Sequence, residues 1–240
     1  MIPSIAKRPI VAFLKKTLPR LSVDFLEVVL YRSILRTKFS SLYASTQITK
    51  REDVWDYAVS IIGGDKKILF LEFGVWEGYS IKYFSSKMKN EKSILYGFDS
   101  FEGLPEDWGN KRAGTFSTQG IAPIVEDRRV SFVRGWFQNT LPPFVINGSE
   151  FDAILVHMDA DLYSSTLFCL SQLWHKFDSF FIIFDEFLNH ETRALYNFSQ
   201  CFPCRIDFLA YDHPLPSRVF CKITRISGVG TSAANTEPRP

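Results

Sequence analysis

The sequence predicts an α/β protein with a doubly wound, mostly parallel sheet of seven strands, and three observations support this fold class. Apolar runs alternate with segments of helical composition, which is typical of parallel strands joined by crossover helices. The run from Ile68 to Leu71 has no polar residue, as expected of a strand buried on both faces. Gly74 and Gly78 follow it directly and lead into a helix from Tyr79. Strand, glycine turn and helix N-terminus together form the usual ligand-binding corner of such folds.

The remaining elements follow in order along the chain. Strands are expected at residues 93–99, 129–134, 153–158, 179–184, 205–211 and 218–223. Helices are expected at 24–37, 49–62, 79–90 and 163–174. A capping box of Thr49 and Glu52 is predicted to open the second of these helices. Between residues 102 and 129 the chain is rich in glycine and proline, which indicates a long loop of the kind that covers an active site.

The basic residues are concentrated near the N-terminus. Residues 1–50 carry nine Lys or Arg against Asp24 and Glu27, a net charge of +7, whereas the whole chain carries +2. An overall charge this small does not indicate nucleic-acid binding. We expect residues 1–48 to form a basic helical layer, with helices near 10–16 and 24–37, that packs on the domain and serves as a lid. A membrane-surface or partner-binding helix is the alternative.

The rest of the chain is expected to form one domain, residues 49–226, followed by a disordered tail, residues 227–240, which has almost no large apolar residue. No run has the roughly eighteen apolar residues of a transmembrane helix, and no convincing signal peptide is present. The four cysteines lack the density of a disulfide scaffold. The sequence therefore predicts a soluble, cytoplasmic protein without a nucleic-acid partner or a membrane span, and it leaves a homodimer open.

The glycine turn lacks the motifs that bind dinucleotides and nucleotide phosphates, and this narrows the choice of ligand. A dinucleotide site requires G-x-G-x-x-G so that the backbone can approach a pyrophosphate, but Trp76 stands at the second glycine position, and no P-loop motif is present. Glu72 ends the apolar strand, and a carboxylate there needs a partner such as a ligand amino group. The pattern Glu72-x-Gly74-x-x-x-Gly78 resembles the first motif of class I S-adenosylmethionine-dependent methyltransferases. An ordinary βα turn, with glycines for packing, is the alternative.

A further cofactor contact is predicted after the next strand. Asp99 stands about twenty residues beyond the glycine turn, where a doubly wound fold places the carboxylate that binds ribose hydroxyls. A cap for the turn from Asp99 to Gly103 is the alternative role. We predict S-adenosylmethionine as the cofactor, bound by Glu72, Gly74, Gly78, Asp99 and Ser100.

Carboxylates also gather at the ends of two later strands. Asp159 and Asp161 are two residues apart in an extended segment, so their side chains point the same way. Asp185 and Glu186 follow the next strand, and the ends of adjacent strands lie roughly 4.8 Å apart. No Lys or Arg is near these residues in the local sequence, so a hard divalent cation with oxygen ligands is the expected partner. Solvated carboxylates and helix caps are the alternative.

Four motifs together resemble the macrocin O-methyltransferase (TylF-like) family of class I methyltransferases: LEFGVWEGYS, GFDSFEGLPEDW, MDADLYSST and IIFDEF. The resemblance extends over roughly residues 49–220. It implies a Rossmann-like methyltransferase fold that carries S-adenosylmethionine, with Mg²⁺ held by Asp159, Asp185 and Glu186 and with Asp161 as the general base. Glu186 stands where that family usually has Asp.

The resemblance thus implies a Mg²⁺-dependent O-methyltransferase that moves a methyl group from S-adenosylmethionine to a hydroxyl of a small molecule, with a sugar or glycosylated natural product as the suggested acceptor. Two other functions stay open. One is a protein that binds S-adenosylmethionine without turnover, which the intact aspartates argue against. The other is an NAD-type oxidoreductase, which Trp76 argues against. His157 is interpreted as a wall residue of the site.

Overall fold

The computed structural model describes residues 23–226, and the chain divides into two compact units after Ser40. The first unit contains α2 (Val23–Thr37), which confirms the helix predicted over 24–37. The helix predicted at 10–16 and the tail predicted at 227–240 lie outside the described residues. The basic layer of residues 1–48 and its role as a lid therefore stay predictions. None of the helices within residues 23–226 has both the length and the apolar character needed to span a membrane.

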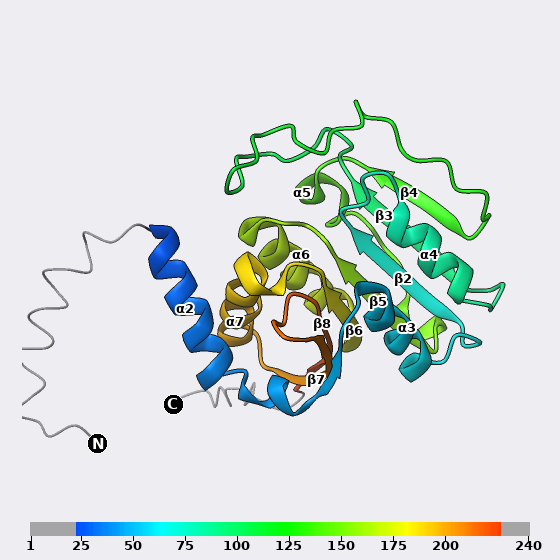
Figure 1. The fold of residues 1–240 in the computed structure, drawn as a ribbon. Coiled ribbons are helices and arrows are strands. Elements are labelled where there is room, and N and C mark those ends of the chain that lie inside the picture. The colour runs from blue at the N-terminus through cyan, green and yellow to red at the C-terminus, as the bar shows by residue number, and fades with distance from the viewer. Residues whose placement is uncertain (1–22, 227–240) are drawn as a thin grey trace, which may run out of the picture. The chain divides into compact units, whose positions relative to one another are not determined.

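The second unit is built around a sheet of eight strands in the order β1-β7-β8-β6-β5-β2-β3-β4 (Figure 1). Strand β8 is antiparallel to both of its neighbours, and the other strand pairs are parallel. The predicted doubly wound, Rossmann-like fold is confirmed. The strands are β1 (Thr46–Ile48), β2 (Ile68–Phe73), β3 (Ile94–Asp99), β4 (Val130–Arg134), β5 (Ala153–Met158), β6 (Ser179–Phe184), β7 (Cys204–Asp212) and β8 (Val219–Arg225).

The prediction of seven strands missed β1. This strand of three residues pairs in parallel with the end of β7 at the edge of the sheet. Thr46 and Gln47 are exposed, so the segment has no apolar run that would indicate a strand. The domain start predicted at residue 49 stays a prediction, and β1 lies just before it in the same sheet.

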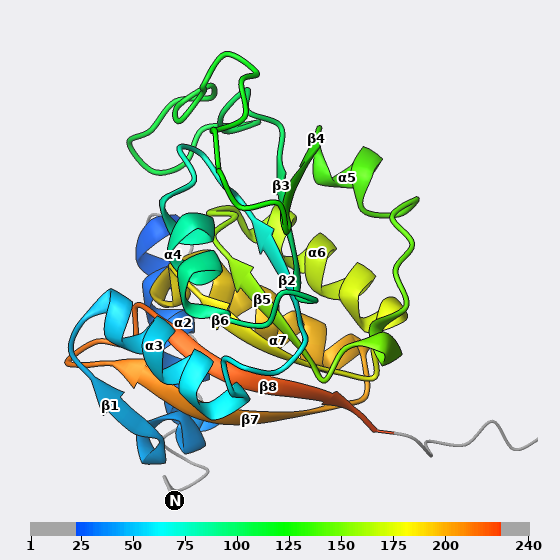
Figure 2. The same ribbon diagram turned by 90° about the vertical axis from the view of Figure 1, so that its right-hand side faces the viewer.

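Helices cover both faces of the sheet (Figures 1 and 2). On one face lie α3 (Arg51–Ile62) and α4 (Tyr79–Lys87), and on the other lie α5 (Phe137–Thr140), α6 (Tyr163–Lys176) and α7 (Thr192–Cys201). Because both faces are covered, all six residues of the central strand β2 are buried, as the apolar run predicts. The core between the sheet and α3 and α4 includes Trp55, Ile68, Phe70, Phe84, Leu95, Leu155, Ile183 and Phe220.

The capping box predicted at Thr49 is wrong. Helix α3 begins at Arg51, and its N-cap is Lys50, which makes no side-chain hydrogen bond to the helix. The chain bends at Thr49 and Lys50 after β1, and Lys50 itself is extended (φ −122°, ψ 149°), so Thr49 lies one residue outside the cap position. The Glu52 side chain instead accepts a hydrogen bond from the Tyr79 hydroxyl at 3.1 Å. This start makes Arg51 the first helical residue.

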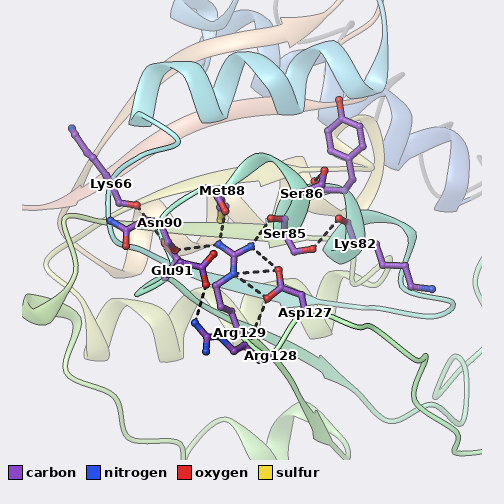
Figure 3. A network of polar contacts seen from close by, with 12 residues as sticks. Lys66, Lys82, Ser85, Ser86, Met88, Asn90, Glu91, Asp127, Arg128 and Arg129 are labelled. Atoms are coloured by element: carbon purple, nitrogen blue, oxygen red, sulfur yellow. Dashed lines mark hydrogen bonds and ion pairs between the residues drawn. The ribbon is translucent and has the colours of Figure 1, made fainter.

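The long loop predicted over 102–129 is observed between β3 and β4. Arg129 fastens its end to α4 and to the loop itself (Figure 3). The guanidinium donates hydrogen bonds to the carbonyl oxygen of Ser85 (2.7 Å) and to the Asp127 carboxylate (2.6 Å). It also donates to the carbonyl oxygens of Met88 and Asn90, beyond the end of α4. The loop therefore has a fixed end beside the helix that follows the glycine turn.

Candidate active site

Backbone hydrogen bonds continue past the ends of the central strands and fix the positions of the residues that follow. The N–H of Gly74 donates to the end of β3 (3.0 Å), that of Asp159 to the end of β2 (2.9 Å) and that of Asp185 to the end of β5 (3.0 Å). These three residues therefore meet at one edge of the sheet, as the order of parallel strands predicts.

A cavity of about 360 Å³ opens at this edge. The predicted site residues that line it are Gly74, Asp99, Ser100, Asp159, Asp161, Asp185 and Glu186. Glu72 and Gly78 are not among its lining residues. The rest of the wall includes the aromatic residues Trp76, Tyr79, Phe116, Trp136 and Phe137 and the basic residues Arg51 and Lys111. The fold thus brings most of the predicted residues together and adds an aromatic wall and two cations.

The two glycines of the turn have left-handed backbones, with φ of +90° at Gly74 and +77° at Gly78. A Cβ on Gly74 would lie 1.9 Å from the carbonyl oxygen of Asp159, and one on Gly78 would lie 2.8 Å from Pro123. Both positions are therefore restricted to glycine by the protein itself. Direct contact of either glycine with a cofactor stays a prediction.

Asp99 organises the glycine turn through both carboxylate oxygens. Oδ2 accepts hydrogen bonds from the N–H groups of Val75 (2.7 Å) and Trp76 (2.9 Å), and Oδ1 accepts one from Phe101 (2.7 Å). The turn-capping role considered for Asp99 is therefore observed. A carboxylate has about four acceptor positions, so the geometry leaves room for a ligand hydroxyl as well. The ribose contact stays a prediction.

Glu72 has a protein partner. It lies in register with His157 of β5, and its Oε1 is 2.9 Å from the Nδ1 of that ring, with both side chains fully buried. Burial alone would lower the pKa of His157, but the charges of Asp185 and Glu72 outweigh burial and raise the pKa to about 9. The raised pKa favours the protonated ring, and His157 is the protein partner of the side chain for which a ligand amino group was predicted.

Two arginines that are distant in sequence reach the predicted metal ligands. Arg51 places Nη2 3.5 Å from Oδ2 of Asp159 and Nε 3.2 Å from Oδ1 of Asp185. Arg218, just before β8, places Nε 3.5 Å from the same oxygen of Asp185. The sequence argument for a divalent cation used the absence of neighbouring Lys or Arg. That premise is wrong in the folded chain, because tertiary contacts supply both guanidinium groups.

The two aspartates that share Arg51 differ in their electrostatic surroundings. Burial raises the pKa of Asp159, and the charge of Asp185 adds to this effect. Burial would also raise the pKa of Asp185, but His157, Arg51 and Arg218 outweigh it and lower that pKa. Asp185 therefore has the lower pKa of the two and is the aspartate that is more readily ionised.

Asp161 stands apart from this ion-pair cluster. Burial raises its pKa to about 6, and the positive charge of Lys111 opposes the rise. Its backbone is left-handed, with a φ of +58° that is uncommon for a residue with a side chain. Helix α6 has Leu162 as its N-cap, without a side-chain hydrogen bond. The alternative of Asp161 as a helix cap is therefore not supported.

As they lie, the predicted metal ligands do not fit a divalent cation. Within residues 23–226, no group of three or more His, Cys, Asp or Glu side chains is arranged to hold a metal ion. The carboxylates of Asp159 and Asp185 face the guanidinium of Arg51 instead. The buried carboxylate of Glu191 accepts a hydrogen bond from the N–H of Glu186 (3.0 Å), which anchors the backbone of the third predicted ligand.

Sequence reasoning missed Arg51, Lys111, Arg218 and Glu191. Arg51 and Arg218 reach the site only through the packing of separate elements, so their neighbours in sequence give no functional signal. Lys111 lies in the loop that was expected to cover the site, and Glu191 is only five residues from Glu186. For Arg51 the one available signal is a cation in the first turn of a helix, where the helix dipole disfavours positive charge.

The sheet order and the flanking helices define a Rossmann-like fold, and a solved structure agrees with this class. The crystal structure of CalS11, a calicheamicin methyltransferase, aligns with a TM-score of 0.54 at 18% identity and covers 95% of each chain. The apo structure of CalS11, described as a TDP-rhamnose 3'-O-methyltransferase of calicheamicin biosynthesis, aligns with a TM-score of 0.47 at 18% identity, covering 95% of this chain and 97% of that one. The first of these likenesses shows the fold.

Sequence comparisons find similarity to O-methyltransferases. The Macrocin-O-methyltransferase (TylF) family matches residues 115–201. Demethyldecarbamoylnovobiocin O-methyltransferase of Streptomyces niveus is 24% identical over 180 residues, which cover 66% of this chain and 63% of that protein. The chain thus spans less than two thirds of the length of this curated relative. The predicted resemblance to TylF-like methyltransferases is confirmed.

Proposed function

We propose that this protein is an S-adenosylmethionine-dependent O-methyltransferase that acts on a hydroxyl of a small molecule, with a sugar of a glycosylated natural product as the acceptor. The observation that carries the proposal is the cavity of about 360 Å³, where the glycine turn, Asp99 and Asp161 face one space. Cofactor and acceptor must meet in one enclosed space for a methyl group to pass between them.

The cofactor end of the cavity favours S-adenosylmethionine over a dinucleotide. A pyrophosphate needs free backbone N–H groups in the glycine turn as well as at the start of the helix that follows it. Here the N–H groups of Val75 and Trp76 are already donated to Asp99. The Trp76 indole, which packs against Phe116 with ring centroids 5.4 Å apart, lines the same wall. In the proposal, Asp99 keeps this turn in place and accepts a hydrogen bond from a ribose hydroxyl.

The acceptor end contains the proposed general base. An acceptor hydroxyl must lose its proton as its oxygen attacks the methyl carbon, and Asp161 would take that proton. A positioned base of this kind contributes about 10²–10⁴ in rate. The left-handed backbone at Asp161 supports this role, because strained residues cluster at functional sites. The sugar acceptor is suggested by CalS11, which is described as a TDP-rhamnose 3'-O-methyltransferase.

The Mg²⁺ predicted from the sequence would supply a Lewis acid to the acceptor oxygen, with Asp159, Asp185 and Glu186 as its ligands. Because Asp159 and Asp185 face Arg51, we assign Mg²⁺ no role in the proposed reaction. The involvement of Mg²⁺ stays a prediction from the sequence alone.

Calorimetric titration of the full chain with S-adenosylmethionine and with NAD tests the cofactor. We expect S-adenosylmethionine alone to bind, and Asp99→Ala to weaken it about 10- to 100-fold through the loss of charge-assisted hydrogen bonds. Asp152→Ala is the matched control, because Asp152 also accepts a backbone hydrogen bond, from Lys67 (2.9 Å), but stands before β5 rather than after it. Equal affinities of the two variants would contradict the assignment of Asp99.

Incubation with labelled S-adenosylmethionine and a panel of sugar and phenolic hydroxyl compounds then tests the reaction. We expect label in at least one sugar. Cofactor binding without transfer to any hydroxyl would favour the non-catalytic alternative, and binding of NAD in place of S-adenosylmethionine would favour the oxidoreductase.

A further inference from the structure

We propose that the guanidinium of Arg51 is the resident cation of the acidic site and occupies the role expected of a divalent metal ion between Asp159 and Asp185. Arg51 is on this view a positioning residue that holds the two strand-end carboxylates in place. The inference deepens the proposed function. Only one consequence of it rests on that function, namely that methyl transfer does not depend on divalent cations.

The two ion pairs of Arg51 place its guanidinium between the strand ends. One side chain reaches both strand ends, with Nη2 3.5 Å from Asp159 Oδ2 and Nε 3.2 Å from Asp185 Oδ1. The same two carboxylates would be the ligands of a metal ion at this edge. In each of them, one oxygen that the ion would need is paired with Arg51 instead. A divalent cation and the guanidinium therefore compete for one position.

Positive charge also surrounds Asp185. Its Oδ1 is buried and lies 3.2 Å from Nε of Arg51, 3.5 Å from Nε of Arg218 and 3.9 Å from Nε2 of His157. Two guanidinium groups and the ring of His157 thus surround one carboxylate oxygen. A divalent ion at that oxygen would meet repulsion from both guanidinium groups, in a partly buried place where charges are weakly screened.

Arg51 is held in place from the side of the core. It is the first residue of α3, where the helix dipole disfavours a cation. Its Cζ lies 4.6 Å from the ring centroid of Trp55, one turn further along the helix, and Trp55 is fully buried. The aromatic ring supports the guanidinium from the core side while the two carboxylates face its nitrogen atoms. The contacts across the sheet edge thus explain a cation that the helix by itself would disfavour.

The test compares metal binding by the full-length protein and by matched variants after chelation and dialysis. Arg51→Met removes the charge and keeps an unbranched apolar stem over Trp55. Lys50→Met is the control, because it removes the same charge at the exposed neighbouring residue. Mn²⁺ binding is measured by calorimetry and by the electron paramagnetic resonance signal of the bound ion, and the melting temperature is recorded with and without Mn²⁺.

We expect the wild-type protein and Lys50→Met to show no stoichiometric Mn²⁺ site. Arg51→Met should bind one Mn²⁺ per chain at least 10-fold more tightly than the wild type, and its melting temperature should rise with Mn²⁺. The double variant Arg51→Met/Asp159→Asn should lose this site. Chelated wild-type protein should also transfer methyl groups at a rate that changes less than 2-fold on addition of Mg²⁺.

Two results would overturn the inference. One is a stoichiometric Mn²⁺ site in the wild-type protein that the substitution Asp159→Asn removes. This result does not require Arg51→Met to fold. The other is a folded Arg51→Met variant that gains no Mn²⁺ site. Calorimetry with S-adenosylmethionine separates these results from a failure of the proposed function, because cofactor binding and Mn²⁺ binding are measured independently.

Discussion

Glu72 and His157 stand side by side on the paired strands β2 and β5, and Oε1 of Glu72 lies 2.9 Å from Nδ1 of His157 with both side chains fully buried. A buried pair of this kind is costly to break, because removal of one partner leaves an unpaired charge in the core, at about 3–5 kcal/mol. Replacement of both partners by apolar residues is often neutral. The pair links the strand before the glycine turn to the strand before Asp159.

The first prediction follows from this relationship. His157→Leu should lower the free energy of unfolding in urea by about 3–5 kcal/mol, because Glu72 loses its partner while Asp185 keeps Arg51 and Arg218. The double variant Glu72→Leu/His157→Leu should be more stable than His157→Leu alone. Additive losses in the two single variants and the double variant would show that the two residues do not act as a pair.

A second prediction compares two glycines with left-handed backbones. Gly74→Ala should lower the free energy of unfolding by about 2–5 kcal/mol, because the new Cβ would lie 1.9 Å from the Asp159 carbonyl oxygen in addition to the backbone strain. Gly109→Ala is the control, since φ is +55° there but nothing lies within 4 Å of the new Cβ, and it should cost only about 1–2 kcal/mol. If both variants lost the same free energy of unfolding in urea, the close approach of Gly74 to Asp159 would not restrict the residue at position 74.

The third prediction concerns the proposed base. Asp161→Asn keeps the shape of the side chain and removes its ability to accept a proton, so the rate of methyl transfer should fall by about 10²–10⁴ while the affinity for S-adenosylmethionine stays within 2-fold or so. Glu102→Gln, an exposed carboxylate in the loop after β3, is the control and should keep its rate. An unchanged rate in Asp161→Asn would assign proton removal to another group.

A fourth prediction concerns pH and the network at the end of the long loop (Figure 3). Hydrogen bonds from Arg129 hold the pKa of Asp127 below its usual value. The folded protein therefore gains stability from ionised Asp127 above the unfolded pKa of about 3.9, and this gain is lost as the pH falls below that value. In urea unfolding, the wild-type protein should exceed Asp127→Asn in stability at pH 6, and the difference should narrow as the pH is lowered through about 4.

Asp178→Asn is the control for this measurement. Asp178 also pairs with an arginine, Arg225, at 3.3 Å, but its side chain is 89% exposed, so the pair should contribute little at either pH. A constant difference between the wild-type protein and Asp127→Asn from pH 6 to pH 3 would contradict the assignment.

The sequence by itself predicted the parts of the fold that depend on local pattern. The apolar runs that became β2, β3, β5 and β6 end in glycine or a carboxylate, and because these strands are parallel neighbours, their ends meet at one edge. The positions of Gly74, Asp99, Asp159 and Asp185 around one cavity follow from that rule. The strand β1 escaped prediction because an edge strand of three mostly exposed residues has no apolar signature.

Tertiary structure decided which charges face one another. Glu72 meets His157 because β2 and β5 are adjacent in register, and Asp185 meets Arg51 because the start of α3 lies over the strand ends. Such contacts join residues far apart in the chain, and ion pairs have no periodicity that a sequence pattern could reveal. The position of the carboxylates could therefore be predicted from the sequence, whereas the pairing of Asp159 and Asp185 with Arg51 depends on the folded structure.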